Sequence, residues 1–247
     1  MSAAAPKPSM VEGDPPGLDL TALRSYLDRA VPGLVVGRLT GEVLPGGRSN
    51  LTYAVTDGTN RWVVRRPPLG HVLATAHDMA REYRVLTALG PTVIPVPETL
   101  HLCEDADLIG APFYLMEYVD GTVYREPSEL DALAPERVRA LALSILDTLA
   151  DLHALDPAAI GLGDFGRPDG FNERQVRRWK RQLDGSRGRE VPGIDDLHDR
   201  LAATVPQIDG AQGRTGTLVH GAGTSQDSPP SAWAVPATIF AAPISTG

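Results

Sequence analysis

The sequence predicts an α+β protein of two lobes, in which an N-terminal lobe of antiparallel sheet plus helix precedes a helical lobe. Residues 51–66 alternate apolar and polar side chains on both sides of Asp57-Gly58, a pattern typical of a β-hairpin. Helical spacing of apolar residues appears before and after this hairpin and dominates the chain beyond Gly121. With 42% hydrophobic residues among 247, the chain has enough apolar material for a buried core.

The first ordered element is predicted to be a short amphipathic helix. Residues 1–17 are rich in Ala, Pro and Gly without an apolar period, which favours a disordered leader. Asp19 suits the N-cap position, and apolar residues recur at helical spacing after it until Pro32-Gly33 ends the run. The recurring residues are Leu20, Leu23, Leu27 and Val31.

A second helix and two more strands complete the predicted N-terminal lobe, residues 18–118. The helix spans 76–89 and ends at Gly90-Pro91. Its apolar face carries Met79, Tyr83, Leu86 and Leu89. The strands follow at 101–103 and 111–116, on either side of an acidic turn.

The rest of the chain divides into a helical part, 119–221, and a tail, 222–247. A helix opens at Pro135 and runs to about Leu155, and amphipathic stretches follow at 171–183 and 195–205. The tail has no Lys or Arg, no helical period and one acid, and we predict that it is disordered.

Composition excludes several classes of protein. A net charge of −8 argues against a nucleic-acid binder, because the phosphate backbone attracts basic surfaces. No run is apolar enough to span a membrane, and the N-terminus lacks the apolar region of a signal peptide, so we expect a cytoplasmic protein. The one cysteine, Cys103, excludes an internal disulfide, and the histidines show no zinc-ligand spacing with it.

The segment Gly46-Gly47-Arg48-Ser49-Asn50 lies between two predicted strands. Backbone N–H groups of such a glycine-rich loop can close over phosphates. A surface hairpin turn explains the same pattern when it is taken alone. The choice between a phosphate-binding loop and a surface turn therefore depends on the residues that follow.

Strand alternation places Val63 and Arg65 on one face, where an apolar residue could line a nucleotide base and a cation could neutralise phosphate. Arg65 could equally be a solvated edge charge. Glu82 borders the apolar face of the helix over 76–89 and needs a cationic partner, for which Arg65 is the candidate.

Four motifs in this order resemble the protein-kinase-like fold. GGRSN at 46–50 resembles its glycine loop, Arg65 its phosphate-binding cation, Glu82 its helix glutamate, and Met116-Glu117-Tyr118-Val119 its hinge. The resemblance implies that Glu117 and Val119 offer backbone groups to adenine, that Met116 walls the pocket, and that ATP and Mg²⁺ are cofactors.

More narrowly, roughly residues 18–221 resemble the aminoglycoside phosphotransferase family. The branch that this chain resembles includes actinobacterial phosphotransferases and kinase-like domains fused to acyl-CoA dehydrogenases. The resemblance implies an ATP-dependent kinase that acts on a hydroxyl of a small metabolite or an antibiotic-like acceptor. The motifs are RRPP, REYRVLTAL, FYLMEYVDG, LADLHALDP, GLGDFGRPDGF and RQVRRW.

The resemblance breaks at the catalytic loop. The family has His-Gly-Asp, an Asn five residues later and a further metal-binding Asp, whereas His220-Gly221 is followed here by Ala222, and Asp227 stands where the Asn belongs. Alanine cannot accept a proton from an acceptor hydroxyl, so we expect no catalysis. A reading-frame shift after Gly221 would explain the abrupt change. A genuine pseudokinase, which binds nucleotide or a partner, is the alternative.

Three further expectations depend on this break. Without later elements to cover it, the apolar face of the helix from Pro135 should be partly exposed, and the chain should tend to aggregate. The basic run Arg174 to Arg181 is a solvated helix face or, in the second interpretation, a site for an anionic substrate. The acceptor molecule and the oligomeric state stay open.

Overall fold

The computed structural model describes residues 13–44, 50–70, 78–124, 127–166, 170–189, 191–211, 219–221 and 234–236. Its helices are α1 Leu20–Ala30, α2 Met79–Leu89, α3 Pro135–Ala154, α4 Phe171–Ser186 and α5 Ile194–Ala211, with a short 3₁₀ helix at Pro127–Leu130. Its strands are β1 Thr40–Val43, β2 Leu51–Thr56, β3 Arg61–Arg66, β4 Thr99–Cys103, β5 Phe113–Glu117, β6 Val219–Gly221 and β7 Ala234–Pro236.

The main sheet has five strands in the order β1-β2-β3-β5-β4, and all its neighbours are antiparallel. The predicted hairpin is confirmed as β2 and β3, with Leu51 opposite Arg66. Asp57 closes its turn, because its side chain accepts hydrogen bonds from the backbone N–H groups of Thr59 and Asn60 at 2.9 and 2.7 Å. This local chemistry fixes the register of the hairpin.

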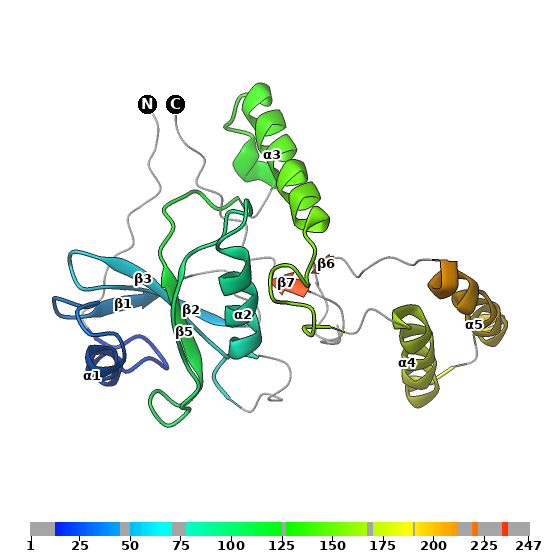
Figure 1. The fold of residues 1–247 in the computed structure, drawn as a ribbon, viewed down its shortest axis with the longest axis horizontal. Helices are drawn as coiled ribbons and strands as arrows, with labels where there is room; N and C mark the ends of the chain where they lie inside the picture. The colour runs from blue at the N-terminus through cyan, green and yellow to red at the C-terminus, as the bar shows by residue number, and fades with distance from the viewer. Residues whose placement is uncertain are drawn as a thin grey trace.

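The two faces of the sheet are covered by different helices (Figure 1). On one face, α1 packs its buried leucines against Tyr53, Trp62, Phe113 and Leu115. On the other face, α2 packs against Tyr114 together with residues from the end of α3 and from the segment after it. Side chains alternate along each strand, so Val63 and Arg65 belong to the face that α2 covers in part.

Both helices of the N-terminal lobe begin at aspartate caps. The Asp19 carboxylate accepts a hydrogen bond from the backbone N–H of Ala22 at 2.8 Å, which confirms the predicted cap. Asp78 caps α2 by accepting from the N–H of Arg81 at 2.9 Å. This cap places the first residue of α2 at Met79, three residues after the predicted start at Ala76.

Helix α3 has the exposed apolar face that the sequence predicts. Leu152 is the one buried residue of its 20. Leu143, Ile145 and Leu146 keep 47%, 60% and 59% of their surface in contact with solvent. The described part of the chain therefore anchors α3 by its last turns and leaves its middle uncovered.

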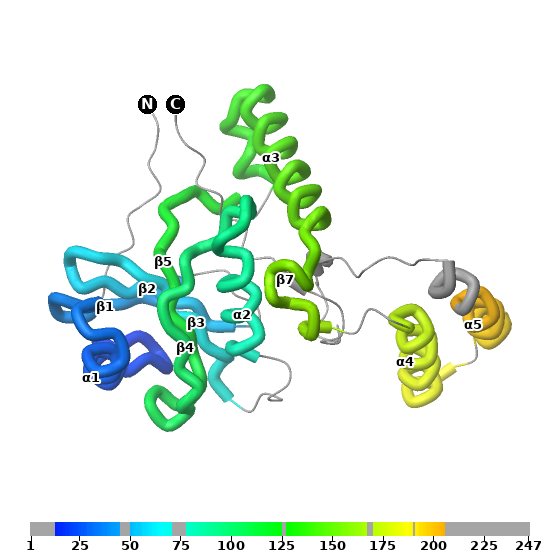
Figure 2. The backbone as a smooth tube through the Cα atoms, in the orientation of Figure 1, coloured from blue at the N-terminus to red at the C-terminus, as the bar shows by residue number. Residues whose placement is uncertain are grey.

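Helices α4 and α5 pack on each other and lie apart from the main sheet, as the tube in Figure 2 shows. Strands β6 and β7 pair in parallel, with His220 opposite Val235, and β7 lies near α2. Strand β7 is the part of 222–247 that the structure describes, and the predicted disorder of that tail otherwise falls outside the described residues. No described helix is long and apolar enough to cross a membrane.

Candidate nucleotide site

An ion pair between Arg65 and Glu82 is the centre of the candidate site. Arg65 lies on β3 and Glu82 in the first turn of α2, and Arg65 Nε donates to Glu82 Oε2 at 2.7 Å. The two side chains keep only 6% and 16% of their surface exposed. The predicted partnership is thus confirmed, and the alternative that Arg65 is a solvated edge charge is wrong.

Three further polar groups surround this pair. Asn50 Nδ2 donates to Glu82 Oε1 at 2.8 Å, and the Tyr114 hydroxyl donates to Glu82 Oε2 at 3.1 Å. Arg65 Nη1 donates to Thr52 Oγ1 at 3.2 Å. Sequence reasoning did not assign Thr52 or Tyr114 to the site. In the structure, Thr52 lies opposite Arg65 in the β2–β3 register.

Electrostatics keep the Arg65 guanidinium charged. Burial alone would lower the pKa of the Arg65 guanidinium, but the charge and hydrogen bond of Glu82 outweigh burial and raise that pKa above its ordinary value. Burial, followed by the nearby Glu82 carboxylate, raises the pKa of the Tyr114 hydroxyl. Tyr114 therefore stays a neutral donor over the physiological range.

An apolar strip continues from Arg65 along the same face of the sheet. Val63 stands between Ala54 on β2 and Met116 on β5 in the strand register. Val63 and Ala54 are buried and Met116 is partly buried. A flat aromatic base can lie on such a strip while the charged end of the ligand meets the cation beyond it.

The predicted hinge, at the end of β5 and just after it, is held from two sides. The backbone N–H of Glu117 donates to the carbonyl of Glu98 at 2.8 Å, so Glu117 can offer an adenine only its carbonyl oxygen. Arg61 stacks over the Tyr118 ring, 3.7 Å from its centroid, and donates to Asp120 at 2.9 Å. Val119, between these contacts, is partly buried.

Two parts of the predicted site lie outside the described residues. They are Gly46, Gly47, Arg48 and Ser49 of the glycine loop, and Ala222 and Asp227 after the break. Of His220 the structure describes only the backbone, in β6. In the ranges that are described, no group of three or more His, Cys, Asp or Glu side chains could hold a metal ion.

Asp164-Phe165-Gly166 has the letters of the kinase metal-binding triplet, but its surroundings give it another role. It precedes His220, whereas the kinase triplet follows the catalytic loop. Asp164 forms an ion pair with Arg84 of α2, and Arg81 stacks over the Phe165 ring at 3.6 Å. The triplet fastens the segment that follows α3 to α2.

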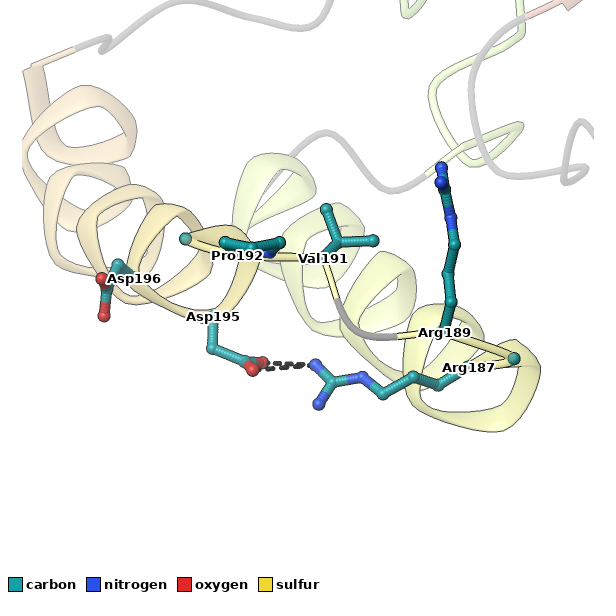
Figure 3. A pocket seen from close by; sticks show the side chains of 8 residues that line it. Arg187, Arg189, Val191, Pro192, Asp195 and Asp196 are labelled. Carbon is teal, nitrogen blue, oxygen red and sulfur yellow. Dashed lines mark hydrogen bonds and ion pairs between the residues drawn. The ribbon is translucent and has the colours of Figure 1, made fainter.

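Two hollows of the surface lie on the α4–α5 hairpin. The larger, of about 560 Å³, is formed at the α4–α5 connection beside the Arg187–Asp195 ion pair (Figure 3). A second hollow lies along the basic run of α4. In that run Arg177 pairs with Glu173 and Lys180 with Asp184, and no residue of α4 is buried. These contacts favour the interpretation as a solvated helix face.

Three features together define a kinase-like α+β fold. They are a five-stranded antiparallel sheet, a flanking helix whose glutamate pairs with a cation on a strand, and a helical segment after the predicted hinge. The sequence profile of the phosphotransferase enzyme family matches residues 40–223. The chain therefore belongs to this family, as its motifs predicted.

Two relatives and one solved structure show how much of each protein this chain matches. Acyl-CoA dehydrogenase family member 11 of Gallus gallus is 37% identical over 206 residues, or 82% of this chain and 26% of that protein. Family member 10 of Mus musculus is 36% identical over 199 residues, or 79% of this chain and 18% of that protein. The chain thus spans about a quarter or less of these relatives.

The solved structure is that of a proposed aminoglycoside phosphotransferase from Ralstonia eutropha. It is 32% identical, with a TM-score of 0.67, and the match covers 88% of this chain and 63% of that one. At this identity and TM-score it supports the α+β, kinase-like assignment of the fold.

Proposed function

We propose that this chain is a nucleotide-binding member of a family of ATP-dependent small-molecule kinases, and that it does not transfer phosphate. The observation that carries the proposal is the buried Arg65–Glu82 ion pair at the end of the apolar strip of Ala54, Val63 and Met116. The family's acceptor would be a hydroxyl of a small molecule.

ATP fits the described residues. The strip of strand residues offers an apolar floor to adenine, and the hinge offers the Glu117 carbonyl and the backbone of Val119. A guanidinium held by a carboxylate is a fixed cation suited to phosphate oxygens. When bound, ATP would supply the transferable γ-phosphate.

Magnesium and phosphoryl transfer do not fit this chain. Transfer needs one carboxylate to orient the acceptor hydroxyl and others to hold the metal. Ala222 follows His220-Gly221 where that first carboxylate belongs, and Asp227 is the one acid in 222–247. Among the described residues, no acidic cluster replaces them.

The origin of the break has two candidate explanations, a frame shift and a genuine pseudokinase. The family match ends at residue 223, two positions after Gly221, which supports an abrupt change and not a gradual divergence. Resequencing the gene across the His220-Gly221 codons and translating all frames discriminates between them. Asp at the next codon and Asn five codons further in another frame would show a broken copy of a working kinase. Their absence from every frame would support the pseudokinase.

A melting experiment with a turnover assay tests the proposed function. ATP should raise the melting temperature of the chain, and magnesium should add little to the shift, because the metal-holding carboxylates are missing. Phosphate should not appear on hydroxylated acceptors or in solution. Unchanged melting with ATP would overturn nucleotide binding, and magnesium-dependent turnover would overturn the loss of transfer.

A further inference from the structure

Glu42 of β1 has a buried carboxylate oxygen that lacks a hydrogen-bond partner. Across the described residues, Glu42 Oε1 is the one buried side-chain nitrogen or oxygen atom without a donor or acceptor beside it. The Glu82 carboxylate, by contrast, accepts hydrogen bonds from Arg65, Tyr114 and Asn50. A buried acceptor without a donor costs stability, so the stability of the free chain does not explain Glu42.

The strand register places Glu42 at one end of the apolar strip. Glu42 on β1 lies opposite Ala54 on β2, which in turn lies opposite Val63 on β3. Val63 lies opposite Met116 on β5. Residues that stand opposite each other in an antiparallel sheet point their side chains to the same face. The four residues therefore form one row, with the hinge at its β5 end and a carboxylate at its β1 end.

A nucleotide on this strip has few groups that can donate a hydrogen bond to Glu42. They are the amine of the base and the hydroxyls of the ribose. The hinge, at the β5 end, offers the Glu117 carbonyl to the amine. Amine and ribose are attached to different rings of adenine and lie at opposite ends of the base. With the amine at β5, the ribose end points towards β1, which is three strand spacings, or roughly 14 Å, away.

We propose that Glu42 Oε1 accepts a hydrogen bond from a ribose hydroxyl of the bound nucleotide and makes the site selective for ribonucleotides over deoxynucleotides. This proposal rests on the proposed nucleotide-binding function and adds the class of nucleotide that the site prefers. Ribose hydroxyls can donate, and a carboxylate oxygen accepts. The ligand thus supplies the donor that the free chain does not.

The unpartnered oxygen of the free chain becomes a source of selectivity in the complex. A site that bonds a ligand hydroxyl rejects an analogue without that hydroxyl, because its own buried polar group is then left unpaired. The bond is strong for its kind, since its acceptor is a carboxylate. Phosphates attached to this ribose can reach the adjacent row of the same face, in which Arg65 lies opposite Thr52.

An effect of the Glu42 charge alone is the competing explanation. A negative charge at the site would act on the phosphates, which ATP and its deoxy analogues share. Replacing Glu42 would then change the affinity for all these nucleotides by the same factor. A hydrogen bond to a hydroxyl predicts instead that the replacement removes the difference between them. The ratio of the dissociation constants for a deoxy analogue and for ATP is therefore the informative quantity.

The experiment is calorimetric titration of the full chain with ATP, 2′-deoxy-ATP and 3′-deoxy-ATP. We expect the unmodified chain to bind at least one of the two analogues roughly tenfold more weakly than ATP, the loss typical of one hydrogen bond to a charged group. In Glu42→Ala this ratio should fall below about twofold. In Glu42→Gln, which keeps a neutral acceptor, roughly threefold discrimination should remain.

Glu104→Ala is the matched control, because it removes an exposed acid and should keep the full discrimination. If the unmodified chain binds ATP and both analogues equally, or if Glu42→Ala keeps the ratio of the unmodified chain, the ribose contact is wrong. Failure of both Glu42 variants to fold would show a structural role and overturn the proposal. Absence of ATP binding by the unmodified chain would instead overturn the proposed function, and the ribose contact with it.

Discussion

Arg84 of α2 forms an ion pair with Asp164, and its Nη2 also donates to the carbonyl of Gly161 at 2.9 Å. On the same helix, Glu82 faces the sheet and pairs with Arg65. Helix α2 is therefore fastened on one side to the cation of the candidate site and on another to the segment that follows α3. Any shift between the lobes has to act on the helix that carries Glu82.

Removing Glu82 should cost more stability than removing an exposed acid. Glu82→Ala leaves the Arg65 guanidinium buried without its counter-charge, and we expect a loss of about 3 kcal/mol in the free energy of unfolding. Urea unfolding monitored by circular dichroism measures it. Exposed Glu104→Ala, the control, should change stability by less than about 0.5 kcal/mol. Equal effects of the two variants would contradict the structural role of the pair.

Tyr114→Phe should lower stability near neutral pH by about 1 kcal/mol, because the hydroxyl bond to Glu82 is lost. The folded-state pKa of Tyr114 is raised, so its contribution is fully present below the unfolded pKa and is lost as pH rises through the folded pKa.

The gap between the unmodified chain and Tyr114→Phe should therefore close as the pH passes about 10, where an unfolded tyrosine ionises. Chemical unfolding at pH 7 and at several values up to about 11 measures this gap. A gap that widens with pH would show that the hydroxyl is not held neutral. Exposed Tyr124→Phe should change the stability at pH 7 by less than about 0.5 kcal/mol.

Asp57 should make the protein sensitive to acid. Burial would raise the pKa of Asp57, but hydrogen bonds from the backbone N–H groups of Asn60, Val36 and Thr59 outweigh it and hold the pKa well below its usual range. A lowered folded pKa gives stability that is present above the unfolded pKa and is lost as pH falls.

Asp57→Ala should thus cost about 2 kcal/mol near pH 7 and flatten the loss of stability below about pH 4. Unfolding curves from pH 7 down to pH 2 measure both effects. Asp131→Ala, at an exposed position beyond the 3₁₀ helix, is the control. It should lose stability at low pH as the unmodified chain does. If stability fell as steeply with falling pH in Asp57→Ala as in the unmodified chain, the low pKa of Asp57 would be contradicted.

The sequence predicted the parts of the site that depend on local pattern. Alternation in the hairpin placed Val63 and Arg65 on one face, and helical spacing placed Glu82 where it could meet Arg65. Tyr114 was not predictable in this way. Its role depends on the pairing of β5 with β3, two strands that are distant in the chain and carry no short-range signal of their contact.

The environment of the helices could be predicted only in part. Apolar spacing showed that α3 has an apolar face, and the break in the family resemblance after Gly221 predicted the exposure of that face. Spacing could not show that Arg81 would stack on Phe165 or that Arg84 would pair with Asp164. An arginine on a helix has no preferred partner that the sequence reveals.

The uncovered face of α3 should bind hydrophobic dye and promote self-association. Replacing Leu143, Ile145 and Leu146 by Gln should reduce dye fluorescence and shift sedimentation towards the monomer, with stability nearly unchanged because these side chains are exposed. Leu152→Ala is the contrasting variant, since it opens a cavity in the core beside α2 and should cost about 3 kcal/mol. Unchanged dye binding by the triple variant would show that the face is covered in solution.

Titration of ATP into the unmodified chain and into Arg65→Ala, followed by calorimetry, tests the central claim most directly. The account predicts saturable binding to the unmodified chain and at least about tenfold weaker binding to Arg65→Ala, as loss of a charged phosphate contact implies. Arg29→Ala, an exposed cation on α1, should bind as the unmodified chain does. No binding to the unmodified chain, or equal binding to Arg65→Ala, would contradict a nucleotide site built on the Arg65–Glu82 pair.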